Sequence, residues 1–284
     1  MGDNWDFDDA DLADPSVLDH FVAQWPDLAL FGAFIALAMF SFYRKSIPLK
    51  YVTLVFSVAF LGVYKSSLVS IVNVMGAFGG IVPLHIESIL FSALVVFTLI
   101  ATVLWGRVYC GRICAFGALT QLLDAIMPRR LQIEVPAALE KRASYIKFFI
   151  LFGAIGAFLL THEIAFYRYI EPFWLFSFEA STLLWIGLGV LLIASLFVRN
   201  LYCRFLCPLG AALGLLSKVS VFRIKRWSEC STCQLCEKKC EWGAIRQRQI
   251  IMTECVRCDE CEILYASKTR CPHWLLEAKR QRLR

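Results

Sequence analysis

The C-terminal end of this 284-residue chain concentrates its cysteines, and their spacing constrains the fold more than any other feature. Eight of the twelve cysteines lie in the last 55 residues. They form the runs Cys230-x2-Cys233-x2-Cys236-x3-Cys240 and Cys255-x2-Cys258-x2-Cys261, and a single Cys271 follows. Thiolates at this spacing are ligands of [4Fe–4S] clusters. The pattern therefore predicts iron–sulfur centres at this end of the chain.

In bacterial ferredoxins with two clusters, the fourth cysteine of each run binds the cluster of the other run. This rule predicts two clusters with crossed ligand sets. The sets are Cys230, Cys233, Cys236 and Cys271 for one cluster, and Cys240, Cys255, Cys258 and Cys261 for the other. So small a domain is expected to take much of its folding energy from the bound clusters. Zinc is the alternative metal, since paired cysteines also bind it.

The rest of the chain is apolar enough to cross a membrane. The chain is 58% hydrophobic and 18% charged, with a mean hydropathy of +0.62. Soluble domains are nearer half apolar and a quarter charged. A helix needs about 20 apolar residues to cross the hydrocarbon core. We predict five spans, at about residues 28–43, 49–75, 84–105, 145–162 and 179–198.

Basic residues lie almost entirely on one side of the predicted spans. Sixteen Lys and Arg flank the spans on that side, whereas Arg168 stands alone on the other and residues 1–27 carry eight Asp. The positive-inside rule places the N-terminus outside and the cysteines in the cytoplasm, where reduced thiols favour metal ligation over disulfides. The predicted domains are an acidic periplasmic tail (1–27), a membrane bundle (28–222) and a cytoplasmic ferredoxin-like domain (223–284).

A cysteine motif occurs twice in the membrane region. Tyr109-Cys110-x3-Cys114-x2-Gly117-Ala118 recurs 93 residues later as Tyr202-Cys203-x3-Cys207-x2-Gly210-Ala211. We predict two parallel repeats, each a helix hairpin followed by the motif. Cysteines four apart share a helix face, so the two pairs are expected to meet near the cytoplasmic surface. A further metal or iron–sulfur centre or a redox-active thiol pair would fit there. The alternative is that these small apolar residues only fill packed helices.

Two ionisable residues lie within or beside the predicted spans. Lys65 lies inside the second span, and Glu87 opens the third span from outside. Ionisable residues at membrane depth are functional candidates by default. We predict that they pair and contribute to a quinone site, where a carboxylate accepts quinol protons. The alternative is a purely structural Lys65 and an interfacial Glu87.

Several segments together resemble the NosR/NirI family of membrane electron-transfer proteins, which is related to the quinol-oxidising NapH proteins. They are the two motif copies, Ile71-Val72-Asn73-Val74, Ile170-Glu171-Pro172-Phe173 and the stretch from Cys255 to Cys271. The resemblance covers about residues 49–275. It implies an electron-transfer subunit of the bacterial inner membrane, and not a stand-alone enzyme. That subunit would pass electrons from the quinone pool or a separate flavoprotein toward nitrous oxide reductase or a related periplasmic reductase.

The chain departs from the family pattern in two places. NosR-type members carry a periplasmic FMN domain ahead of the spans, where this chain has an acidic stretch of 27 residues. A separate flavoprotein, a stand-alone variant and a fragment of a longer chain are the three explanations. The first motif also has Ala115 where the family has proline, whereas the second keeps Pro208.

The expected fold class is an α-helical integral membrane protein with a small α+β ferredoxin domain. Two adjacent clusters favour an electron conduit over a membrane redox sensor or maturation factor, which needs only one cluster. A transporter is less favoured, because the spans lack the Gly- or Pro-broken helices expected at a midplane site. The basic end from Lys279 to Arg284 is read as a solvated tail near an anionic leaflet, with no nucleic-acid partner.

Overall fold

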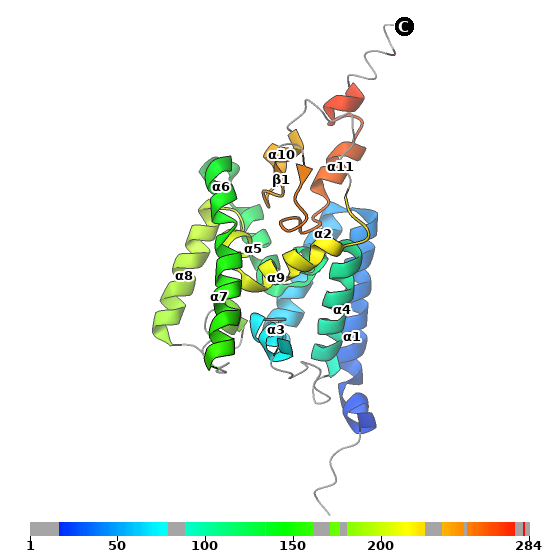
Figure 1. The fold of residues 1–284 in the computed structure, drawn as a ribbon. Helices are drawn as coiled ribbons and strands as arrows, with labels where there is room; N and C mark the ends of the chain where they lie inside the picture. The colour runs from blue at the N-terminus through cyan, green and yellow to red at the C-terminus, as the bar shows by residue number, and fades with distance from the viewer. Residues whose placement is uncertain are drawn as a thin grey trace, which may run out of the picture.

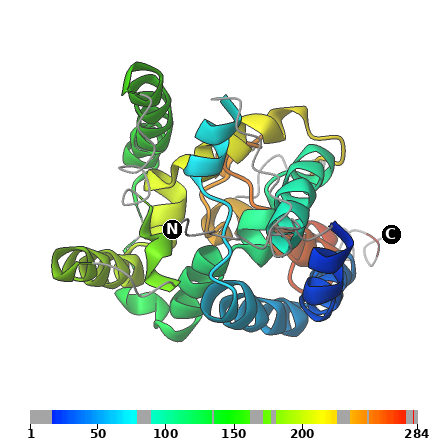
Figure 2. The same ribbon diagram turned by 90° about the horizontal axis from the view of Figure 1, so that it is seen from below.

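Upright helices form a bundle, and a small cysteine-rich domain caps one end of it in the computed structural model (Figure 1). The structure describes residues 17–78, 89–133, 135–161, 171–176, 181–224, 235–246, 249–275 and 281. The upright helices are α1 (Val17–Arg44), α2 (Ile47–Ser57) with its π-helical continuation η2 (Val58–Tyr64), α4 (Ile89–Trp105), α7 (Ile146–Thr161) and α8 (Thr182–Phe197). Seen from below, α7 and α8 lie on one side and α1, α2 and α4 on the other (Figure 2).

Helices occupy all five places where spans are predicted. Three stretches are long and apolar enough to cross a membrane, namely Gln24–Arg44, Ile47–Tyr64 and Leu139–Thr161. Helices α4 and α8 are apolar but have only 17 and 16 residues, or about 25 Å at 1.5 Å per residue. The number of spans therefore stays a prediction. Large apolar side chains on α7 and α8 face outward, such as Leu160 at 86% exposure and Leu183 at 78%. Such an outer surface suits lipid better than water.

The second predicted span is shorter than expected. Its helix ends at Tyr64, and residues 65–70 are not helical before α3 (Ile71–Phe78) begins. The break falls at Ser66, whose backbone takes a left-handed conformation (φ 47°) that ends a helix. The hydroxyl of Ser66 donates to the Phe176 carbonyl at 2.8 Å, and that of Ser67 donates to the Lys65 carbonyl at 3.0 Å. The helix at the second predicted span, about 49–75, is therefore interrupted between Tyr64 and Ile71.

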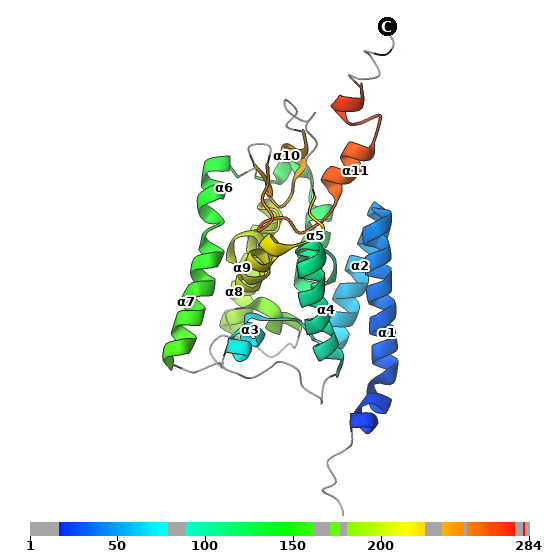
Figure 3. The same cartoon turned by 45° about the vertical axis from the view of Figure 1, so that its right-hand side comes forward.

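The two copies of the cysteine motif fold alike. Helix α4 leads into the π-helical turn η4 (Tyr109–Ile113) and then α5 (Ala115–Ile126). Helix α8 leads into the turn η8 (Tyr202–Leu206) and then α9 (Pro208–Leu216). Figures 1 and 3 place α5 and α9 in the middle of the molecule, just below the cysteine-rich domain. Four short helices complete the connections: η5 (Arg129–Leu131), α6 (Ala137–Ala143), η7 (Pro172–Phe176) and η9 (Ser217–Val219).

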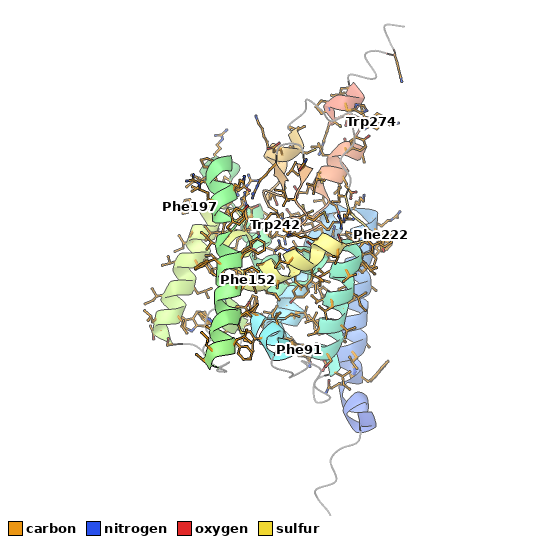
Figure 4. The ribbon with its side chains drawn as sticks, in the orientation of Figure 1. Phe91, Phe152, Phe197, Phe222, Trp242 and Trp274 are labelled. Carbon is orange, nitrogen blue, oxygen red and sulfur yellow. The ribbon has the colours of Figure 1, made fainter. Side chains whose placement is uncertain are left out.

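The described part of the C-terminal domain contains little regular structure. It has the short helices α10 (Leu235–Lys239) and α11 (Glu260–Ala266). Strands β1 (Ile245–Arg246) and β2 (Gln249–Ile250) pair antiparallel, with Ile245 opposite Ile250. The α+β class of the whole domain remains a prediction. Trp242 is 2% exposed at the base of this domain, where it meets the bundle, whereas Trp274 lies at the far end (Figure 4).

Candidate iron–sulfur sites

Four cysteines predicted to share one cluster line the same cavity in the C-terminal domain. The cavity has a volume of about 370 Å³ and lies between this domain and α2. Its lining includes Cys240, Cys255, Cys258 and Cys261, with Cys236 as a fifth thiol. Cys240 comes from the first run and the other three ligands from the second, which is the crossed arrangement expected of a two-cluster ferredoxin. The cavity therefore fits the predicted second ligand set.

The other predicted ligand set can be followed only in part. Cys230 and Cys233 lie outside the described residues. Cys236 lies on α10 beside the cavity, and Cys271 is buried after the loop that follows α11. Within the described ranges, no three Cys, His, Asp or Glu side chains converge closely enough to hold a single metal ion. A four-iron cluster takes more widely spaced thiols, because each thiolate binds a different iron atom.

Backbone amides surround the sulfur atoms of the cavity. The Ala244 amide donates to the Cys240 sulfur at 3.3 Å, and the Arg257 amide lies close enough to stabilise the Cys255 thiolate. Burial nevertheless dominates, and it raises the pKa of Cys255 to about 11. A free thiol here stays neutral at pH 7, whereas a bound metal deprotonates it. The site is thus built to be completed by metal.

The four cysteines of the repeated motif form a second site, inside the bundle. Cys114, Cys203 and Cys207 are buried in one core cluster, and Cys110 packs against it. Their sulfur atoms lie close enough to influence one another electrostatically. The four thiols therefore gather as the repeat suggested, and we refer to them as the motif site.

The local geometry of the motif site differs from the expected single helix face. Cys110 and Cys203 lie in the π-helical turns, whereas Cys114 and Cys207 are the extended N-cap residues of α5 and α9. The chain therefore turns between the two cysteines of each pair. Glycine permits this turn, since a Cβ added at Gly117 would lie 2.7 Å from the Cys110 carbonyl oxygen.

The surroundings of the motif site favour negative charge. The Gly210 amide donates to the Cys207 sulfur at 3.2 Å, and both N-cap cysteines lie at helix N-termini, where the helix dipole is positive. Cys203 is buried, and a buried free thiol stays neutral and is a poor partner in thiol exchange. A metal centre therefore fits the motif site better than a redox-active thiol pair.

Buried polar atoms without partners adjoin the motif site. The Arg107 Nε and the Tyr202 hydroxyl are both buried and form no hydrogen bond within the described part of the chain. Such groups are costly unless something satisfies them. The sulfur atoms of a cluster are acceptors for such donors, so these orphaned groups add to the fit.

The loop from Met252 to Asp259 joins the two sites. The Ser217 hydroxyl donates to the Met252 carbonyl, and Arg107 Nη1 donates to the Thr253 carbonyl, each at 2.8 Å. Gly111 is closely packed as well, since an added Cβ would overlap the Val256 carbonyl oxygen. One core cluster contains Cys114, Cys203, Cys207, Val256 and Trp242, with Cys110, Cys240 and Cys258 packed against it. The two cysteine sites are therefore neighbours in the folded chain.

Two buried ion pairs connect the bundle to this loop of the C-terminal domain. Lys147 of α7 pairs with Glu254, and Arg112 Nη2 of η4 lies 3.3 Å from Asp259 Oδ2. Sequence reasoning counted these basic residues only as charge on the cytoplasmic side and gave the two acidic residues no role. The available signal was an acidic residue just before the second cysteine run, Glu254, and another within it, Asp259.

Lys65 contacts a carboxylate other than the predicted one. It lies at the end of η2 and forms an ion pair with Asp27 of α1, and the Tyr64 hydroxyl approaches the same carboxylate. Its side chain is 27% exposed, so it is not buried in mid-span. Glu87 lies outside the described residues, and the predicted pair with Lys65 is untested.

Family models match both cysteine regions. A model described as NosR matches residues 228–282, and a 4Fe-4S binding domain model matches residues 88–134 and 181–226, which contain the two motif copies. The regulatory protein NosR of Pseudomonas aeruginosa strain PAO1 is 36% identical over 80% of this chain and 34% of its own length. A second NosR sequence from Pseudomonas aeruginosa is 42% identical over 28% of this chain and 82% of its own length. The chain belongs to the NosR/NirI family.

Other comparisons agree with this family. The protein NirI of Paracoccus denitrificans is 38% identical over 59% of this chain and 26% of its own length. No solved structure matches. The chain spans about a third of the length of the NosR relatives it matches over most of its own residues. This member of the NosR/NirI family is thus a mostly helical chain with helices apolar enough to cross a membrane and with 4Fe–4S binding regions.

Proposed function

We propose that the chain conducts electrons between a two-cluster ferredoxin domain and a further metal centre in the membrane bundle. The first cluster takes Cys230, Cys233, Cys236 and Cys271, and the second takes Cys240, Cys255, Cys258 and Cys261. The third centre takes the motif site. When bound, these clusters supply reversible one-electron chemistry.

The observation that carries this proposal is the junction between the two cysteine sites. The loop that bears Cys255 and Cys258 packs directly on the repeat that bears Cys110. A sensor needs only one centre and a surface that its partner can reach. Two thiol sites in one continuous core instead suit electron passage between them.

The motif site also shortens the path across the membrane. With the basic residues inside, the ferredoxin domain lies in the cytoplasm and a periplasmic acceptor lies about 30 Å away. A centre at the motif site lies within the bundle, on the way to that acceptor. We propose a bacterial inner-membrane location and, as partners, the quinone pool or a separate flavoprotein. The outlet is a periplasmic reductase such as nitrous oxide reductase. Lys65 and Glu87 remain the candidates for quinone contact.

Iron and sulfide counting tests the proposal. Protein purified without oxygen should hold about eight irons for two cubanes and about twelve for three. A variant with Cys110, Cys114, Cys203 and Cys207 all replaced by serine should lose only the iron of the motif site. A matched variant with Cys255 and Cys258 replaced by serine should lose iron from the C-terminal domain. Equal iron in wild-type protein and the first variant would exclude metal from the motif site.

A regulatory role is the second candidate, because the NosR relatives carry the name regulatory protein. Sustained electron flow in vesicles separates the two roles. A conduit passes many electrons from a reduced donor on one side to an acceptor on the other. A regulator stops after its clusters have been reduced once.

A further inference from the structure

Arg107 lies where three parts of the molecule meet. It precedes the first cysteine motif, and its Nη1 donates to the Thr253 carbonyl in the loop of the C-terminal domain. On the other side, a Cβ added at Gly210 of the second repeat would lie 2.8 Å from Arg107 Nη2. The side chain is 1% exposed. Its charge interacts with the thiols of Cys110 and Cys207, one from each motif copy.

Arg107 differs from the other described buried basic residues in how its charge is paired. Lys50 and Lys147 pair with Glu260 and Glu254. Arg112 and Arg257 both lie beside Asp259. Within the described ranges, Arg107 forms no ion pair with a carboxylate, and its Nε has no hydrogen-bond partner. Glu254 interacts electrostatically with Arg107 but is already paired with Lys147.

A buried cation without an anion is unfavourable, so the fold should supply negative charge close by. Neutral thiols do not supply that charge. A cluster held by four thiolates does, because it carries net negative charge, and reduction makes it more negative. The second repeat offers no equivalent cation, since the residue 93 positions after Arg107 is Asn200. Asn200 instead accepts a hydrogen bond from the Thr120 hydroxyl at 3.0 Å.

We propose that Arg107 is the counter-ion of the motif site and a positioning residue that raises its reduction potential. This inference rests on the proposed metal centre at the motif site. A fixed positive charge in a low-dielectric interior stabilises the reduced, more negative centre. The same guanidinium holds the Thr253 carbonyl, two residues before Cys255, and so fixes the motif site against the second cluster. Lys147 also lies near these thiols, but Glu254 balances its charge.

The test is a redox titration of the purified protein, followed by EPR. The signal of the motif site is assigned beforehand as the one that disappears when its four cysteines are replaced by serine. In Arg107→Gln, the ratio of reduced to oxidised motif centre at a fixed potential should fall about tenfold, which corresponds to about 59 mV for one electron. In Arg107→Lys, which keeps the charge, the ratio should stay within about threefold.

Arg199→Gln is the matched control, since it removes a charge from the same end of the bundle, where Arg199 contacts Gln132. It should leave the potential unchanged. A wild-type potential in Arg107→Gln would overturn the inference. If that variant loses its fold, Arg107→Lys decides, because a tenfold shift despite the retained charge would also overturn it. If no signal disappears in the serine variant, the motif site holds no metal centre, and that result overturns the proposed function and this inference together.

Discussion

The two cysteine sites use the same ligand chemistry in opposite settings. The C-terminal site is a cavity of about 370 Å³ in a domain whose described parts hold short helices and a two-residue ladder. The motif site lies in a helix bundle, among the buried apolar side chains of its main core. Metal should therefore be a large part of the folding energy in the first site and a small part in the second. The C-terminal site is thus expected to fold around its cofactor, whereas the helix bundle forms the motif site before metal binds.

Replacing one cysteine in each site tests this difference in the role of metal most directly and should have the largest effect. Cys258→Ser should remove the cluster and leave the region from residue 235 to 275 open to protease, because so small a domain has little core of its own. Cys203→Ser should remove only the iron of the motif site and leave the bundle resistant. Iron analysis and limited proteolysis of both variants measure this. Equal protease resistance in the two would contradict the proposed role of metal in folding.

The buried pair of Lys147 and Glu254 tests how firmly the two sites are joined. Glu254→Gln should destabilise the protein by about 3–5 kcal/mol, because it leaves a buried cation without its partner. The double variant Lys147→Met/Glu254→Met should lose less, since no charge stays behind. Unfolding midpoints in detergent provide the measurement.

Lys45→Met is the control for that pair, because Lys45 pairs with Glu262 while 42% of its side chain remains exposed. Surface pairs of this kind contribute about 0–1 kcal/mol. If Lys45→Met lowered the unfolding midpoint as much as Glu254→Gln, the buried pair would contribute no more to stability than a surface pair.

A variant that moves the two sites apart without loss of metal tests whether their contact sets the rate of electron transfer between them. Gly111→Ala introduces a Cβ that overlaps the Val256 carbonyl and should push the C-terminal loop away from the first motif. Electron transfer between the sites should slow by about tenfold, the effect of roughly 1.4 kcal/mol on a barrier. Rapid-mixing reduction kinetics report the rate. Gly153→Ala is the control, since nothing lies within 4 Å of its added Cβ, and an equal rate in both variants would speak against the junction as the electron path.

The sequence predicts a ligand set for the C-terminal site because its cysteines lie in short runs with fixed spacing. The cavity brings Cys240 to the second run as the crossed pattern requires. The repeat of Cys110 and Cys203 likewise predicted that the motif thiols meet. The π-helical turns and the N-cap positions of Cys114 and Cys207 could not be read from spacing, because i, i+4 residues are compatible with several backbone paths.

Tertiary packing accounts for the features that sequence reasoning missed. At the break after Tyr64, the Ser66 hydroxyl reaches the Phe176 carbonyl 110 residues away. The pairing of Arg112 with Asp259 joins residues 147 positions apart. No periodicity or local motif encodes such contacts. They appear only once the helices are in place.

The smallest expected effect concerns Lys65, which pairs with Asp27 at the end of η2. Its ion pair with Asp27 is partly exposed, so Lys65→Ala should change stability by only about 0–1 kcal/mol. If Lys65 contacts quinone, the same variant should slow cluster reduction by quinol while the clusters and their iron content stay intact. Asp27→Asn separates the two roles, because it removes the ion pair but keeps the Lys65 amine. Normal quinol-coupled reduction in Lys65→Ala would leave this residue with a structural role alone, and would confine the redox chemistry of the chain to its two cysteine sites.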